Sequence, residues 1–125
     1  MTSDHKLGRE GERLASHYLT KNNFSILNKN WRSGRYGEID IVANDLKTKE
    51  LVFIEVKSRS TSTDDAKELV TKNKQKQLYK LAKSYLYTEN KGKHACRFDV
   101  IAIRISKEGN KLEHIKNAFY NEGNY

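Results

Sequence analysis

The sequence has 125 residues, 36% of them hydrophobic and 32% charged, which suits one modest hydrophobic core and is too short for two. Its 24 lysines and arginines against 16 acids give a net charge of +8, which favours a polyanionic partner such as nucleic acid, although many domains are basic only for solubility. Cys96 is the single cysteine, so no internal disulfide can form, and neither a signal peptide nor a membrane span is visible; we expect one cytoplasmic domain over residues 1–125 without membrane contact.

Apolar residues recur along the chain with periods that alternate between those of helices and those of strands. In order, the sequence predicts a helix over 4–22, strands over 24–31, 37–43 and 51–57, a long basic helix over about 65–88, a strand over 97–105 and an edge strand over 111–115. The strand over 97–105 is apolar on both faces, which is typical of a strand inside a sheet that is covered on both sides. The order α-β-β-β-α-β-(β) therefore predicts an α/β (α+β) fold with a central mixed sheet flanked by helices.

Charged residues on the second and third strands come together if these strands form a hairpin symmetric about residues 47 and 48. The numbers of facing residues then add up to 95, so that Asp40 faces Glu55 and Glu38 faces Lys57. Because side chains alternate along each strand, these four share one face of the sheet. The opposite face is then uniformly apolar and consists of Ile39, Ile41, Ala43, Val52, Ile54 and Val56.

Two facing carboxylates have β-carbons about 5 Å apart and repel each other, so a divalent cation between them would stabilise the hairpin. Mg²⁺ or Mn²⁺ suits such a site, because these ions bind carboxylates together with water and phosphate oxygens. Lys57 could orient or deprotonate an attacking water, and the chemistry indicated is hydrolysis of a phosphodiester. The alternative is a solvated face with cross-strand ion pairs, against which Val42 and Phe53 on the same face argue.

Asp40 followed by Glu55-Val56-Lys57 resembles the PD-(D/E)xK nuclease superfamily, in which an acid on one strand precedes Glu-x-Lys on the next. Ile39 stands where the superfamily's proline would be, which weakens the motif as a pattern. Over residues 8–119 the chain is similar to the YraN-like family of small bacterial proteins, through the segments 8–12, 37–43, 51–57, 74–75, 85–86 and 97–100. The resemblance implies a restriction-endonuclease-like fold related to archaeal Holliday-junction resolvases, and it implies no particular reaction because the family is essentially uncharacterised.

The same resemblance implies roles for two helical residues. Glu12 would reach the metal held by Asp40 and Glu55, and Gln75 on the second helix would support the site. Without the resemblance, Glu12 is an exposed helix glutamate and Gln75 an ordinary surface residue. Glu38 is either a supporting acid or the ion-pair partner of Lys57.

Basic and aromatic residues near the end of the hairpin that carries Lys57, and on the second helix, are candidates for contact with nucleic acid. The alternative is a scattered basic surface. The candidates are Arg32, Arg35, Tyr36, Arg59, Lys72, Lys74 and Lys76. Trp31 could stack on unpaired bases, but core packing explains it better. Asp99 is either a third acid of the metal site or a buried structural acid, and its apolar strand favours the second reading.

The sequence therefore predicts a Mg²⁺- or Mn²⁺-dependent endonuclease that hydrolyses DNA, with branched or structured DNA among the candidate substrates. One alternative is a non-catalytic nucleic-acid-binding module on the same fold, and another is an accessory protein that binds an acidic partner. An intact set of Asp40, Glu55 and Lys57 argues mildly against the non-catalytic module. Symmetric cleavage of a junction would in addition require a homodimer.

Overall fold

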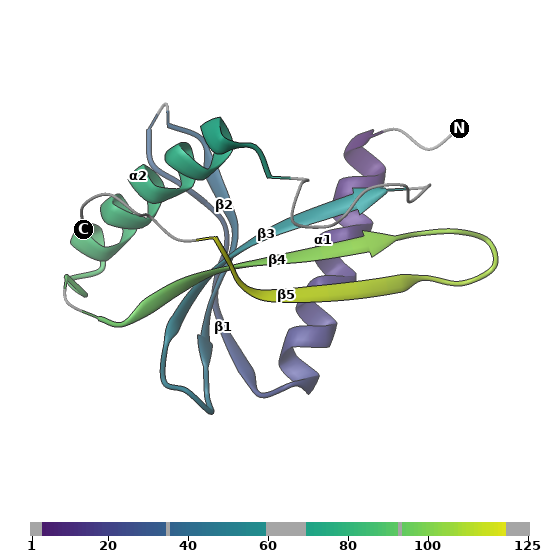
Figure 1. Ribbon diagram of the computed structural model, residues 1–125, viewed down its shortest axis with the longest axis horizontal. Coiled ribbons are helices and arrows are strands. Elements are labelled where there is room, and N and C mark those ends of the chain that lie inside the picture. Colours follow the sequence, from purple (N-terminus) through teal and green to yellow (C-terminus); the bar gives the residue numbers. More distant parts are fainter. Residues whose placement is uncertain (1–3, 35, 60–69, 93, 120–125) are drawn as a thin grey trace.

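The computed structural model describes residues 4–34, 36–59, 70–92 and 94–119 (Figure 1). The elements are α1 (Asp4–Lys21), β1 (Phe24–Arg32), β2 (Glu38–Asp45), β3 (Leu51–Arg59), α2 (Lys72–Thr88), β4 (Cys96–Arg104) and β5 (Lys111–Phe119). The five strands form one mixed sheet in the order β1-β2-β3-β4-β5, in which only the β3–β4 pair is parallel. The predicted fold class and element order are confirmed, and α2 lies in the crossover between the two parallel strands.

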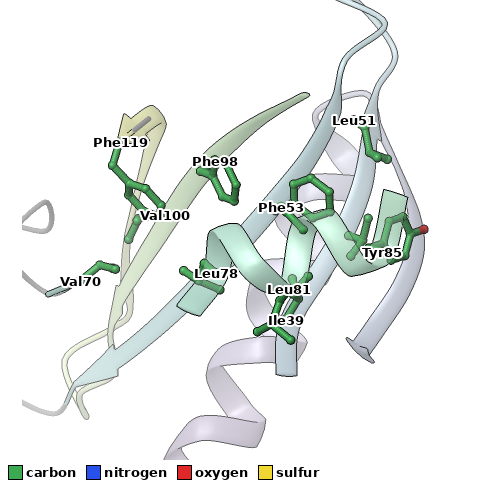
Figure 2. Packing of buried hydrophobic residues seen from close by; sticks show 12 residues of the cluster. Ile39, Leu51, Phe53, Val70, Leu78, Leu81, Tyr85, Phe98, Val100 and Phe119 are labelled. Carbon is green, nitrogen blue, oxygen red and sulfur yellow. The ribbon is translucent and has the colours of Figure 1, made fainter. Parts of the chain in front are cut away.

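The two helices cover opposite faces of the sheet, and β3 contributes to both interfaces. Leu51 and Phe53 pack in the cluster under α2, which Figure 2 shows, whereas Val52 and Ile54 pack under α1. All four are at most 1% exposed, and burying an apolar side chain of this size stabilises the fold by about 1.5–3 kcal/mol. The middle strand is therefore held from both sides, which fixes the direction of every side chain that follows along it. None of the described helices is long and apolar enough to cross a membrane.

The predicted hairpin register is confirmed where β2 and β3 pair. The facing residues are Ile41 and Ile54, Val42 and Phe53, Ala43 and Val52, and Asn44 and Leu51. A turn closes the hairpin through the Asp45 amide, which donates to the carbonyl of Glu50, and through the Asp45 carboxylate, which accepts from the amides of Lys47 and Thr48. The turn thus sets the register on which the candidate site depends.

The predicted position of Ile39 is wrong, because this residue packs under α2 with Val42 and not under α1 with Ile41. Its partner in β1 is Trp31, which packs against the same cluster, as expected for a core tryptophan. Asn30, directly before Trp31, has φ of 52°, a left-handed conformation that interrupts regular alternation. The Trp31–Ile39 pair beyond it therefore meets the α2 face.

The sequence predicts that the second helix begins near residue 65, but Val70 and Thr71 are not helical and α2 begins at Lys72. Residues 65–69 lie outside the described part of the chain. Thr71 is extended, with φ −68° and ψ 163°, and its hydroxyl accepts a hydrogen bond from the Lys74 amide at 3.1 Å. This N-cap satisfies a free amide of the first turn and begins the helix at Lys72. At the other end of the chain, β5 extends to Phe119, beyond the predicted 115.

Candidate active site

The strands β2 and β3 part at Asp40. Their backbone pairing covers Ile41–Asn44 and Leu51–Ile54, although β3 continues to Arg59. One step beyond the last pair, Asp40 Oδ2 accepts a hydrogen bond of 2.8 Å from the amide of Val56. A side-chain carboxylate thus satisfies a backbone donor at the point where the ladder ends, and it ties the two strands together there.

Asp40 and Glu55 lie together at this fork, as the register predicts. Glu55 is only 4% exposed, and Asp40 is partly buried. Burial raises the pKa of Asp40 to about 8, together with the charge of Glu55 and a hydrogen bond to it, whereas the Val56 amide acts in the opposite direction. Two carboxylates this close in a poorly solvated place resist double ionisation, and a nearby cation would relieve that repulsion.

A third acid, Glu12, comes to the fork from α1 because Gly11 allows the helix to lie against β3. A Cβ atom at Gly11 would overlap Ser58 Oγ and would lie 2.9 Å from Ser58 Cβ. Burial raises the pKa of Glu12, and the charges of Glu38 and Glu55 raise it further, while a hydrogen bond to Asn30 lowers it. The reach of Glu12 toward the acids of the sheet therefore depends on the missing side chain at the preceding position.

Two ammonium groups flank Glu55 from different elements. Lys57 Nζ lies 3.6 Å and Lys74 Nζ 3.7 Å from Glu55 Oε2, and both lysine side chains are about one-third exposed. Lys74 was predicted only as a phosphate contact on α2, so its approach to the acid is a feature that the sequence analysis missed. Thr71, which caps the helix three residues earlier, is the signal from which the start of α2 could have been predicted, and with it the residues that face the sheet. Gln75 instead donates to the carbonyl of Val70 at 3.1 Å, at the start of its own helix.

Of the two roles considered for Glu38, the structure shows an ion pair, but with Arg32 at 3.1 Å and not with Lys57. This pair engages one of the predicted phosphate-binding residues, whose side chain nevertheless remains 71% exposed. Tyr36, Arg59, Lys72 and Lys76 are exposed, whereas Arg35 lies outside the described residues. The described basic candidates thus divide into one that contacts Glu55, one that pairs with Glu38 and three that are exposed.

Asp99 belongs to a separate polar network. It is fully buried, receives hydrogen bonds from Arg97 at 3.0 and 3.2 Å and from the Asn117 amide at 2.9 Å, and lies 2.8 Å from His114 Nε2. It sits opposite Ile54, which faces α1, whereas Glu55 is on the α2 face of the same strand. These contacts favour the buried structural acid over the third metal-site acid, and they hold the pKa of Asp99 below its usual value despite burial.

The donor set at the fork suits a magnesium-like cation better than zinc. No group of three or more His, Cys, Asp and Glu side chains in the described ranges is arranged to hold a metal ion. Asp40 and Glu55 provide two adjacent carboxyl groups, and Mg²⁺ commonly takes one or two carboxylates while keeping several waters. The pair therefore fits a hydrated divalent cation, with Lys57 and Lys74 competing for Glu55 when the cation is absent.

Comparison with known proteins places this geometry in a bacterial context. A sequence model of the uncharacterised protein family UPF0102 matches residues 11–103, which include the fork, both lysines and most of the sheet. A UPF0102 protein of Chlorobium limicola is 44% identical over 94% of the chain and 95% of its own length. Another from Geobacter metallireducens is 45% identical over 90% of the chain and 91% of its length, and one from Syntrophus aciditrophicus is 40% identical over 95% and 92%. UPF0102 is the YraN-like family that the sequence motifs indicate, and this resemblance is thereby confirmed.

Proposed function

The chain belongs to the uncharacterised protein family UPF0102, and we propose that it is a Mg²⁺- or Mn²⁺-dependent nuclease that hydrolyses phosphodiester bonds in DNA. The observation that carries this proposal is the pair of neighbouring carboxyl groups of Asp40 and Glu55 at the strand fork, with Lys57 3.6 Å from Glu55. A protein gains no stability from packing two acids together, so a ligand that needs both is the simplest reason for the arrangement. The order of these residues along the chain is also that of the PD-(D/E)xK nucleases.

Each residue at the fork has a role that follows from its contacts. Asp40 and Glu55 would hold the cation, and the bond from the Val56 amide fixes the orientation of Asp40 before any ligand arrives. A bound divalent cation polarises phosphate oxygens and lowers the pKa of a water that it coordinates. Lys57 is one-third exposed, so its ammonium group is accessible to a phosphate oxygen or to the attacking water. Glu12 supplies further negative charge from α1.

A non-catalytic nucleic-acid-binding module is the second candidate, and one observation favours it. Lys57 and Lys74 together neutralise Glu55 without any metal, so the fold itself tolerates the acid. The net charge of +8 would support binding of DNA in either case. Metal binding and cleavage separate the two candidates.

The test compares the wild type with the double variant Asp40→Asn/Glu55→Gln. Asparagine retains an oxygen that can accept the Val56 amide, so the fork keeps its structural bond while both charges are lost. Calorimetry should detect Mn²⁺ binding by the wild type and none by the variant, and cleavage of a labelled panel of duplex, single-stranded and branched DNA should follow the same pattern.

A second double variant controls for the change in net charge. Glu89→Gln/Glu108→Gln removes two exposed acids elsewhere, and it should bind Mn²⁺ and cleave DNA like the wild type. Equal Mn²⁺ binding by the wild type and the Asp40→Asn/Glu55→Gln variant would overturn the proposed site. Metal binding without cleavage of any DNA in the panel would favour the non-catalytic module.

A further inference from the structure

A row of three cations crosses the sheet beyond the candidate site. Arg59 on β3 faces Arg104 on β4 in the parallel ladder, and Arg104 faces Lys111 on β5 in the antiparallel ladder. The three residues thus occupy the same position on three adjacent strands, about 4.8 Å apart from strand to strand. We call Arg59, Arg104 and Lys111 the cationic row.

The cationic row lies on the same face of the sheet as Glu55 and Lys57. The β3–β4 register continues without a shift from Leu51 to Arg59, so Phe53, Glu55, Lys57 and Arg59 all point to the α2 side. This end of the β4–β5 hairpin extends past both helices in Figure 1, so no described helix covers it. Among the described elements, neither helix therefore lies over the row, which continues along β3 from Lys57.

This arrangement is electrostatically unfavourable without a ligand. Like charges on directly facing strand positions destabilise a sheet, and here the repulsion occurs twice along one row. Among the residues that the structure describes, none of the three forms an ion pair, and the buried Nε atom of Arg104 has no hydrogen-bond acceptor. A neighbouring polyanion would remove the repulsion between the three charges.

We propose that the cationic row is a docking surface for the phosphate backbone of duplex DNA, which it leads to the fork between β2 and β3. Arg59 lies four residues after Glu55, which corresponds to about 13 Å along an extended strand. Phosphates on one strand of a duplex rise by about 3.4 Å each, so the row contacts phosphates about four nucleotides from the one at the acids. The identity of the polyanion rests on the proposed function, whereas the position of the row does not.

Binding of DNA without metal tests the row separately from catalysis. The probe is a fluorescein-labelled 20-base-pair duplex, measured by anisotropy in EDTA from 50 to 200 mM KCl. The variant Arg59→Gln/Arg104→Gln/Lys111→Gln should reduce the slope of log K against log salt by about 2.7, because each lost phosphate contact removes about 0.9. Affinity at 50 mM KCl should fall by about tenfold or more.

A matched control removes the same number of charges at the opposite end of β3. The variant Lys21→Gln/Lys47→Gln/Lys49→Asn, in which asparagine suits the φ of 68° at residue 49, should leave the slope within about 1 of the wild type. The charge-retaining variant Arg59→Lys/Arg104→Lys should keep the wild-type slope if the three charges act through phosphate contact. Neutralising the row should also leave the melting temperature unchanged or higher, since it removes repulsion.

The possible results separate the row from the nuclease. Equal loss of slope in the neutral-row variant and the control variant would overturn the row as a specific surface, even if the wild type cleaves DNA. A lower melting temperature of the neutral-row variant together with an unchanged slope in folded protein would also overturn it, because the cations would then be structural. Row-dependent binding of poly-glutamate in place of DNA would assign the surface to an acidic protein. Row-dependent DNA binding in a protein that cleaves nothing would support the row and contradict the nuclease.

Discussion

The close contact between α1 and β3 at Gly11 predicts opposite effects for the same substitution at two glycines of one helix. A methyl group at Gly8 meets no atom within 4 Å, whereas a methyl group at Gly11 would overlap the hydroxyl of Ser58 and crowd its Cβ atom at 2.9 Å. Replacing a helical glycine by alanine gains about 0.5–1 kcal/mol from backbone entropy. Overpacking costs about 1–3 kcal/mol when neighbouring atoms must move.

We therefore expect Gly8→Ala to stabilise the protein by about 0.5–1 kcal/mol and Gly11→Ala to be about 1–3 kcal/mol less stable than Gly8→Ala. At roughly 4 °C per kcal/mol for a chain of this size, thermal unfolding followed by circular dichroism should separate the two variants by about 4–12 °C. Adding Ser58→Gly should restore much of the loss in Gly11→Ala, because it removes the crowded side chain. Equal melting temperatures for the two alanine variants would refute the close approach of α1 to β3, and with it the placement of Glu12.

Three further predictions concern charged residues. The pKa of Asp40 is raised from 3.8 to about 8 in the folded protein, so its protonated form contributes stability that is complete below pH 3.8 and is lost as the pH rises through about 8. Between pH 6 and 9, the melting temperature of the metal-free wild type should therefore fall relative to that of Asp40→Asn. Parallel pH profiles of the two proteins would contradict this. Lys74→Gln removes one ammonium partner of Glu55 and should tighten Mn²⁺ binding by about a few-fold in calorimetry, whereas the exposed-site control Lys76→Gln should not. Arg97→Met leaves buried carboxylates without their cation and should lower the free energy of unfolding in urea by about 3–5 kcal/mol, and a loss below 1 kcal/mol would contradict the network.

The element order and the hairpin register could be predicted because each depends on local pattern. Alternation over 41–43 and 51–57 fixes which residues share a face, and the polar stretch between them fixes the centre of the turn. The pairs from Ile41–Ile54 to Asn44–Leu51 follow from these two facts alone. Placing Asp40 beside Glu55 required only one further step of the same register.

The features that the sequence did not reveal depend on contacts between elements distant in the chain. Ile39 packs on the face opposite to the predicted one because Asn30, on the neighbouring strand β1, adopts a left-handed conformation directly before Trp31, the partner of Ile39. Lys74 reaches Glu55 only because α2 begins at a capped Thr71, and a pattern of lysines spread over all faces of a helix does not show which lysine points inward. Gly11 looks like a weak helix residue until the strand against it is known.

The end of the β2–β3 ladder explains why charge can gather at one place in a sheet whose other positions are apolar. If β2 and β3 stayed paired, Asp40 would directly face Glu55, and the repulsion between the two like charges would destabilise the sheet. At the fork, the Val56 amide binds one oxygen of Asp40, which favours the ionised form, while burial and Glu55 favour the protonated form. These opposing influences keep the carboxyl group oriented without neutralising it permanently. A group in that state can release its proton when a cation arrives, so the local cost in stability is the same property that would let the fork bind a metal.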